Sequence, residues 1–497
     1  MKSTKNKKNP ENIGILRFKE IAAGNKILPL YERLPSSTEY SGKGVTICII
    51  DSGFYSHPDL TKPKNRILTV FDINKPASKR IFRTQHPDNW HGMLTSCVAA
   101  GNGFSSDGYY KSLAGNADVV LIKVKSLKRI SGRSITAAIR WAIEHREQYN
   151  IRIINLSVYD DFDESYKINP VSKAAEDAVN AGIVVVAAVG NDPSAPVRPP
   201  ASAPGVISVG GINDNNIPGF RRVEMYHSNF GHTVDGFIKP EVIAPAIAVP
   251  APILPDTTNH KTAFAVWDIL SKPASEMNEA LIAHIRTGNL PAPGYDITST
   301  VKLKKYLYEQ MARFQIIHPH YQLTEGTSMA SPFVCSVIAQ MIEADPEITP
   351  QEVKNILFET ALKIPGVDKM KQGFGIVNPA EAVKRAVIES VTKAAPVYDS
   401  NPVISTEENI IIFTYHDHNA VNVALTGSFN GWNNEGLQLR KGRAGVWKAE
   451  LPMLAEGTYE YKFIINGTRW VYDPANNHRT DDNHGSFNSV FEVKYPA

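Results

Sequence analysis

The sequence is poor in cysteine and has no long hydrophobic run. Its 497 residues include only Cys48, Cys97 and Cys335, too few for the disulfide framework of a small secreted domain. No stretch of about 18 apolar residues occurs, so we expect no membrane-spanning helix and no membrane partner. Residues 1–40 also lack the apolar core of a secretory signal, which predicts a cytoplasmic protein. The net charge of +3 gives no support for a nucleic-acid partner.

Strand patterns alternate with helix patterns through the first part of the chain. A hydrophobic content of 42% allows a sizeable core, and β-branched runs such as Val45–Ile50 are typical of buried parallel strands. This alternation predicts an α/β fold with a parallel sheet covered by helices on both faces. We expect strands at 119–124, 153–158 and 183–188, and helices at 133–147 and 171–181.

Three chemically reactive residues stand at the ends of such elements. Asp51 follows the strand Val45–Ile50, at the edge where open α/β sheets place their sites. His91 opens a small, apolar helix pattern, and Ser328 precedes the apolar helix at 333–342. Taken singly, each has an ordinary structural interpretation: a turn cap, a structural histidine and a helix cap.

Together with their surroundings, these residues resemble the subtilisin-like serine proteases (subtilases). The resemblance runs from Gly44 to about Val387, and it implies a three-layer α/β fold and a serine endopeptidase. It further implies an Asp51–His91–Ser328 triad, protein or peptide substrates, and no cofactor for the chemistry. The matching blocks are Asp51-Ser52-Gly53, His91-Gly92, Gly326–Pro332 and Gly373–Asn378.

The resemblance extends to two further residues. Asn191, after the buried strand 184–190, is implied as the side-chain donor to the oxyanion, with the Ser328 backbone N–H as second donor. Asp59 resembles a calcium ligand of the family. The other ligands of that site are not recognisable, so a structural calcium ion stays an open alternative, and no other metal site is predicted.

The substrate groove departs from the family pattern. Where the family has glycines, this chain has Tyr159 and Asp160, whose side chains we expect to enter the space beside the specificity pocket. Alignment of Pro200–Pro204 with the family places Arg198 near the pocket floor, where it would favour an acidic residue before the scissile bond. The alternative is a solvent-exposed arginine on a proline-rich loop.

Two segments raise the question of access to the site. An insertion at about 250–323, with helix patterns at 275–286 and 301–314, is either a lid beside the cleft or an extra packed layer. Near the amino terminus, Ile27–Tyr31 resembles the short inhibitory extension of intracellular subtilisins, which predicts self-inhibition.

The composition predicts four regions in the chain. Residues 1–42 form a partly disordered extension, 43–390 the catalytic domain with its insertion, 391–408 a linker, and 409–497 an all-β, immunoglobulin-like sandwich.

The last region resembles the glycogen-binding module of AMP-activated kinase β subunits. The resemblance rests on Leu425–Asn433, Gly457–Phe463, Trp470-x-x-Asp473-Pro474 and Asn488. It implies that Trp432 and Trp470 stack on glucose rings while Lys462 and Asn488 donate hydrogen bonds to hydroxyls. The alternative is that both tryptophans are core residues and that the module only packs on the protease.

Two functions of different class remain. One is a serine endopeptidase recruited to glycogen or another α-glucan by this module. The other is a glucan-binding scaffold whose protease fold is catalytically silent or occluded.

Overall fold

The computed structural model describes residues 27–75, 89–126, 129–394, 401–417, 420–442, 445–482 and 486–495, with backbone alone at 391–394. Most of the predicted amino-terminal extension, 1–26, lies outside these residues. The chain divides into two compact units, Met1–Val387 and Ile388–Ala497, which are described separately.

The first unit is built on an eight-stranded sheet with the order β10-β6-β5-β4-β1-β3-β2, with β7 beside β6. Every pair along this order is parallel, whereas β7 runs antiparallel to β6. The strands are β1 (Thr46–Asp51), β2 (Ile67–Asp72), β3 (Asp118–Lys123), β4 (Ile151–Leu156), β5 (Val184–Ala188), β6 (Ile207–Asn213), β7 (Glu224–Met225) and β10 (Val242–Pro245).

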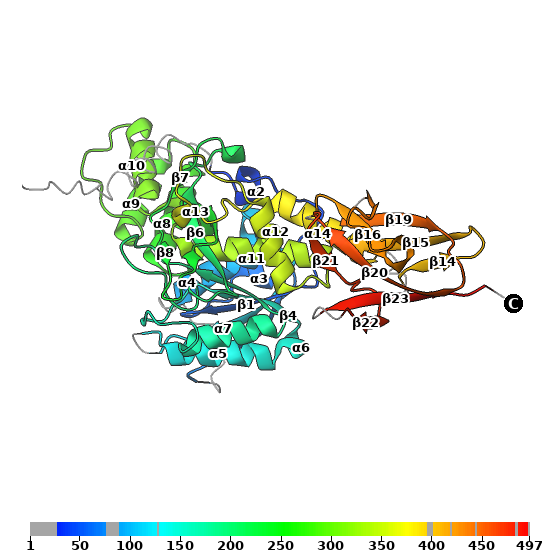
Figure 1. Ribbon diagram of the computed structural model, residues 1–497. Helices are drawn as coiled ribbons and strands as arrows, with labels where there is room; N and C mark the ends of the chain where they lie inside the picture. Colours follow the sequence, from blue (N-terminus) through cyan, green and yellow to red (C-terminus); the bar gives the residue numbers. More distant parts are fainter. Residues whose placement is uncertain are drawn as a thin grey trace, which may run out of the picture. The chain divides into compact units, whose positions relative to one another are not determined.

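Helices cover both faces of this sheet, as the alternation of patterns predicts (Figure 1). Ile47 and Ile49 of β1 point into one hydrophobic cluster, and Cys48 and Ile50 point into a second cluster on the opposite face. The first cluster holds α4 (Trp90–Ala100) and α11 (Thr327–Ala344), and the second holds α5 (Gly132–Glu144) and α7 (Pro170–Asn180). The expected three-layer α/β architecture is thereby confirmed.

Shorter elements and the last helices complete the unit. They are α2 (Leu30–Arg33), α3 (Pro58–Thr61), η3 (Phe104–Ser106), α6 (Arg146–Tyr149), η4 (Pro218–Phe220), β8 (Gly231–His232), β9 (Ile238–Lys239), α12 (Pro350–Thr360), α13 (Lys369–Gln372) and α14 (Pro379–Ala394).

Strand β1 marks the point where the strand order reverses. Its neighbours are β3, which with β2 forms one side of the sheet, and β4, which begins the other side. In sheets of this kind, ligands bind at such a switch point, beyond the carboxyl ends of the strands. Asp51, the last residue of β1, is therefore placed at the expected position for a site.

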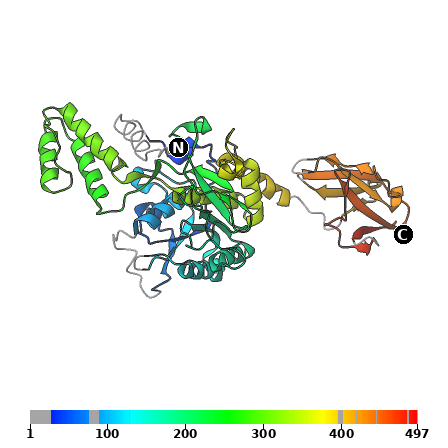
Figure 2. The same cartoon turned by 60° about the vertical axis from the view of Figure 1, so that its left-hand side comes forward.

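The insertion consists of three helices and a small antiparallel sheet of order β11-β13-β12. The helices stand off from the main sheet (green in Figure 2) and pack on one another. The two helices predicted at 275–286 and 301–314 are present, and a helix at 258–270 was not predicted. The elements are β11 (Val249–Pro252), α8 (Thr258–Leu270), α9 (Met277–Arg286), α10 (Thr300–Arg313), β12 (Ile316–His318) and β13 (Tyr321–Thr324).

The second unit is a sandwich of two antiparallel sheets, β14-β15-β19-β18 and β17-β16-β20-β23-β22, with β21 beside β20. In the region of the predicted linker, α14 ends at Ala394 and β14 begins at Val403. The elements are β14 (Val403–Ser405), β15 (Ile410–His416), β16 (Val423–Gly427), η5 (Ser428–Asn430), β17 (Leu437–Gln438), β18 (Arg440–Lys441), β19 (Val446–Pro452), β20 (Gly457–Ile465), β21 (Arg469–Val471), β22 (Arg479–Asp481) and β23 (Phe487–Val493).

Candidate active site

Asp51 and His91 form a hydrogen-bonded pair across two elements. Oδ1 of Asp51 lies 2.7 Å from Nδ1 of His91, the second residue of α4. The other carboxylate oxygen accepts from Oγ1 of Thr95 at 2.9 Å, one turn further along the same helix. Asp51 is completely buried, and the backbone N–H of Ser52 also donates to its Oδ1, at 2.6 Å. These donors satisfy a buried carboxylate and fix the orientation of the imidazole.

The environment of His91 favours its protonated form. Burial alone lowers the pKa of His91, but the charge of Asp51 and the hydrogen bond to it outweigh burial and raise the pKa above its ordinary value. A histidine whose Nδ1 is held by a carboxylate presents Nε2 to an incoming group. His91 is thus suited to accept a proton and to remain stable as an imidazolium.

Ser328 lies in the first turn of α11, which packs against α4 and several strands of the sheet. Gly326, which begins the turn, has φ of 125°, a conformation that favours glycine. The backbone carbonyl of Ser328 accepts from Oγ of Ser157 at 3.1 Å, just beyond the carboxyl end of β4. Ser157 in turn accepts from Asn155, whose Oδ1 holds Oγ of Ser331 at 2.6 Å. The start of α11 is therefore tied to β4.

Asn191 lies against the same turn. Its Oδ1 accepts from the backbone N–H of Thr327 at 2.9 Å and from Oγ1 of Thr327 at 3.0 Å. A Cβ placed on Gly326 would lie 3.4 Å from Nδ2 of Asn191. Because Oδ1 is bonded to Thr327, the Nδ2 group of this exposed residue is the remaining donor of its side chain, next to the turn that carries Ser328. A group of this kind can donate a hydrogen bond to a developing oxyanion.

The side chains predicted to alter the substrate groove have different surroundings. Tyr159 is 51% exposed, and the guanidinium of Arg198 lies 5.6 Å from the centre of its ring. Arg198 is also 4.0 Å from Asp161. Asp160, in contrast, is buried and accepts from Nδ2 of Asn169 at 3.0 Å, so it does not enter the groove as predicted. Tyr159 and Arg198 thus contact one another at the surface.

The surroundings of Asp59 do not fit a calcium ion. Its Oδ2 accepts from the hydroxyl of Tyr321 at 2.5 Å, and its Oδ1 accepts from the backbone N–H of Ser105 at 3.0 Å. Both oxygens thus face donor groups, where a cation would meet positive hydrogens instead of lone pairs. Among the described residues, no group of three or more His, Cys, Asp or Glu side chains could hold a metal ion.

The segment that resembles an inhibitory extension is bonded to the rest of the fold near both of its ends. Ile27 is buried in the core, and its carbonyl accepts from the hydroxyl of Tyr110 at 3.3 Å. Arg33 is fully buried and bonds to both carboxylate oxygens of Asp214. These contacts anchor residues 27–33 as part of the fold.

Residues 42–376 match the family described as "Subtilase family". The chain belongs to the subtilases. It is therefore a serine endopeptidase by family, and subtilases need no cofactor for catalysis. Residues 410–497 match a second family, "Glycogen recognition site of AMP-activated protein kinase".

Individual relatives agree with the family. The chain is 28% identical to "Serine protease AprX" of Bacillus subtilis (strain 168) over 69% of this chain and 67% of the relative. It is 31% identical to "Thermostable alkaline protease" of Halalkalibacterium halodurans over 35% of this chain and 43% of the relative, and so spans less than half of that protein. Among solved structures, one described as proteases from Pseudoalteromonas arctica covers 71% of this chain and 94% of that chain, with 20% identity and a TM-score of 0.48.

The carboxyl-terminal unit brings two of its predicted sugar-binding residues together. The rings of Trp432 and Trp470 are stacked, with centres 6.4 Å apart and planes 29° apart. Trp470 is 38% exposed, and neither ring belongs to the sandwich core, so the core alternative is wrong. Lys462 is buried and ion-paired with Asp482, and Nδ2 of Asn488 donates to Glu460 at 2.8 Å. These two side chains therefore already have protein partners.

Sequence patterns did not identify the residues that bond to the predicted catalytic residues and to Asp59. Thr95, Ser157 and Tyr321 each bond to a predicted site residue or to its neighbour. The position of Thr95, one helical turn after His91, is a local signal that could have been used. Tyr321 is 262 residues from Asp59, and no local pattern could have connected them.

In the part of the chain that is described, no helix has the length and apolarity needed to cross a bilayer.

Proposed function

We propose that this subtilase hydrolyses peptide bonds with Ser328 as nucleophile, His91 as general base and Asp51 as the group that orients His91. The observation that carries the proposal is that four distant segments are joined in two pairs. Asp51 lies 2.7 Å from His91, while Asn191 is bonded to Thr327, the residue before Ser328.

The reaction follows from these positions. Nε2 of His91 takes the proton of the Ser328 hydroxyl as Oγ attacks the substrate carbonyl, and Asp51 stabilises the imidazolium. The tetrahedral oxyanion accepts hydrogen bonds from Nδ2 of Asn191 and the backbone N–H of Ser328. The tetrahedral intermediate then collapses and expels the amine, which receives from His91 the proton that came from Ser328. Water then attacks the acyl-enzyme in the same manner and releases the acid.

Substrate recognition before the scissile bond is assigned to Tyr159 and Arg198. The guanidinium of Arg198 is one-third exposed and lies over the Tyr159 ring. An arginine held on an aromatic face keeps donors free for a carboxylate. The proposal therefore includes a preference for acidic residues at this position, and equal cleavage of peptides with Glu, Leu and Lys there would remove that part of it.

The competing function is a silent scaffold with a protease fold. A fluorophosphonate probe separates the two, because it reacts with an activated serine and not with an ordinary one. We expect the full-length protein to be labelled and the variant Ser328→Ala to stay unlabelled. Equal labelling of both proteins, or of neither, contradicts a nucleophilic Ser328.

We further propose that the carboxyl-terminal module binds an α-glucan and recruits the protease to it. The support is the stacked pair Trp432 and Trp470, of which Trp470 is exposed, since glucose rings pack their C–H faces on indoles. Full-length protein should co-sediment with glycogen, and Trp432→Ala or Trp470→Ala should weaken binding about tenfold or more. Tyr495→Ala is a matched control, because Tyr495 is 48% exposed near the opposite end of β20. If both tryptophan variants bind glycogen as well as the wild-type protein does, this proposal is wrong.

A cytoplasmic location is proposed on the state of the thiols. Cys48, Cys97 and Cys335 are all free and buried, which suits a reducing compartment. Fractionation of cells that express the tagged protein would test it, and recovery from the medium would contradict it.

A further inference from the structure

A pocket of about 360 Å³ is lined by the residue before the proposed base and by residues that precede the turn of the proposed nucleophile in the chain. One wall is Trp90, which directly precedes His91 and has its ring centre 6.1 Å from that imidazole. The opposite side consists of β13 and the residues at its end, Thr324 and Glu325, which lead into the turn of Ser328. The insertion supplies the remainder through Leu254, Asn259 and Phe314.

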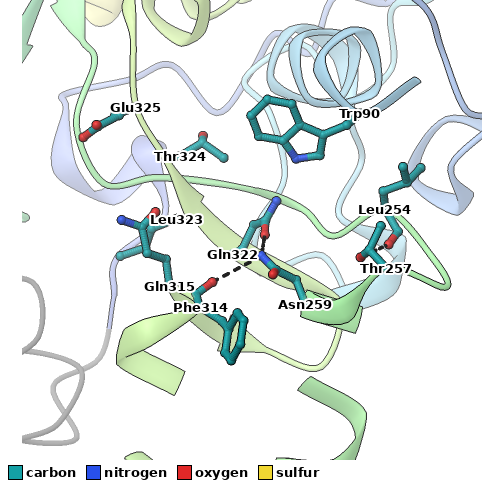
Figure 3. A pocket seen from close by; sticks show the side chains of 10 residues that line it. All are labelled: Trp90, Leu254, Thr257, Asn259, Phe314, Gln315, Gln322, Leu323, Thr324 and Glu325. Carbon is teal, nitrogen blue, oxygen red and sulfur yellow. Dashed lines mark hydrogen bonds between the residues drawn. The ribbon is translucent and has the colours of Figure 1, made fainter. Parts of the chain in front are cut away.

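The pocket has an aromatic wall and a fixed carboxamide floor. Nδ2 of Asn259 donates to Oε1 of Gln322 at 2.6 Å and to the carbonyl of Phe314 at 3.4 Å. This bond orients the Gln322 amide, and Figure 3 shows its nitrogen directed toward Trp90. Trp90 is 43% exposed, so its indole is available to a ligand.

The lining has almost no charge. Of the ten side chains drawn in Figure 3, Glu325 alone is ionisable, and its carboxylate points away from Trp90. A volume near the lower limit for ligand pockets suits a large side chain rather than a methyl group. An aromatic ring matches this set, because it can stack on Trp90 and receive the Gln322 N–H at its face or at a phenol oxygen.

We place this pocket on the side of the leaving amine for two reasons. Asn191, Tyr159 and Arg198 hold the acyl half of the substrate in the proposed mechanism, and none of them lines this pocket. His91 returns its proton to the amine, so the chain after the scissile bond passes His91 and its neighbour Trp90.

We infer that the insertion builds a specificity pocket for an aromatic side chain at one of the first two substrate residues after the scissile bond. This inference rests on the proposed function, since it concerns the substrate of the same site. The insertion thereby contributes to the choice of peptide substrate, through the side chain that this pocket accepts.

The test uses quenched fluorescent peptides that share one acyl half and differ after the scissile bond. We expect kcat/KM of the wild-type protein to be about tenfold higher with Phe or Tyr than with Ala at one of the two positions. In Trp90→Ala, the ratio of kcat/KM for the aromatic peptide to kcat/KM for the alanine peptide should fall below about threefold. Because the ratio is taken within each protein, a general loss of activity does not affect it.

Two further variants keep the test decisive. Asn259→Ala frees the Gln322 amide and should also reduce the ratio, even if Trp90→Ala does not fold. Phe264→Ala removes an aromatic side chain of α8 that is 61% exposed and does not line the pocket, so its ratio should equal that of wild type. An unchanged ratio in both pocket variants, or no aromatic preference in wild type, overturns the inference.

A peptide methyl ester separates this inference from the proposed function, because its leaving group has neither an amino-acid residue nor an aromatic ring. If wild type and not Ser328→Ala hydrolyses the ester, and the peptide series shows no aromatic preference, the pocket's role alone is removed. Failure to hydrolyse the ester or to react with the fluorophosphonate would remove the proposed function, and the inference with it.

Discussion

Two histidine–aspartate pairs in the same unit differ in how they hold protons. His91 and Asp51 are joined Nδ1 to Oδ1 at 2.7 Å, and the pKa of His91 is raised. His57 and Asp59 are also neighbours, but Nδ1 of His57 accepts from the Asp59 backbone N–H, at 3.2 Å. Burial lowers the pKa of His57 to about 4, although the charge of Asp59 acts to raise it.

The difference lies in where each carboxylate directs its oxygens. Asp51 gives one oxygen to the imidazole, whereas the oxygens of Asp59 accept from Tyr321 and Ser105. A buried imidazole with its Nδ1 occupied as an acceptor gains little by protonation, since its charge would be poorly solvated. Hydrogen-bond direction, and not the residue types, therefore distinguishes a proposed base from a structural histidine.

The largest effect should come from removing each imidazole in turn. We expect His91→Ala to lower kcat for peptide hydrolysis by at least about 10⁴-fold, because the proton acceptor is lost. His57→Asn should stay within about threefold of wild type, because asparagine can still cap α3. Both are measured by peptide hydrolysis near neutral pH on protein shown to be folded. Equal losses in the two variants would contradict the assignment.

Acid should destabilise the protein through His57. The pKa of this imidazole is about 4 in the folded state against an ordinary value of 6.5, so the unfolded chain binds more protons between these values. The free energy of unfolding should therefore fall by about 3 kcal/mol from this one group as the pH drops from 6.5 to 4. Urea titrations across this window measure the loss.

The asparagine variant is the control for that effect. An asparagine side chain does not titrate. The free energy of unfolding of His57→Asn should therefore depend less steeply on pH in the same window, by the equivalent of about one bound proton. Identical slopes for wild type and variant would show that His57 is protonated in the folded state.

A smaller loss should follow when Asp59 loses its Tyr321 partner. Tyr321→Phe leaves Oδ2 of a buried carboxylate without that donor, which should cost about 1–3 kcal/mol in thermal or urea unfolding. The matched control is Tyr295→Phe, which also removes a hydroxyl-to-carboxylate bond, to Glu309 at 3.0 Å, but at an exposed site. It should cost less than about 0.5 kcal/mol. A calcium-dependent rescue of Tyr321→Phe would contradict our description of Asp59.

The smallest effect concerns the pH dependence of the rate. A general base must be neutral, and the pKa of His91 is raised, so kcat/KM should fall about tenfold per pH unit below a midpoint that lies above about 6.5. His57→Asn should leave this midpoint unchanged. A midpoint clearly below 6.5 would indicate that Asp51 does not stabilise the imidazolium in solution.

The sequence was sufficient for the parts of the site that depend on local pattern. Asp51 closes a β-branched run and His91 opens a helix, so their elements and positions could be predicted from neighbouring residues. Helix α8 could not, because its buried face is made largely of small side chains such as Ala263 and Ala265, which give little periodic contrast.

Contacts between distant segments were beyond local pattern as well. Asp160 was expected in the groove because it replaces a glycine, but its carboxylate turns back to Asn169 nine residues later. Lys462 and Asp482 of the second unit, which are 20 residues apart in the chain, form an ion pair that no local pattern indicates. Side-chain direction is decided by tertiary packing, which a single sequence does not display.

The base of the insertion closes on itself. Pro252 of β11 lies opposite Tyr321 of β13, so the chain leaves and re-enters the protease fold at neighbouring positions. The segment between these two residues is replaceable as a unit. A tight hairpin turn could join β11 to β13 in its place without moving the strand that leads to Ser328. Such an exchange would keep Trp90 and discard the wall contributed by Asn259 and Phe314. Hairpins of other composition could be grafted at the same two positions, which makes this one location a natural place to alter selectivity while the chemistry stays constant.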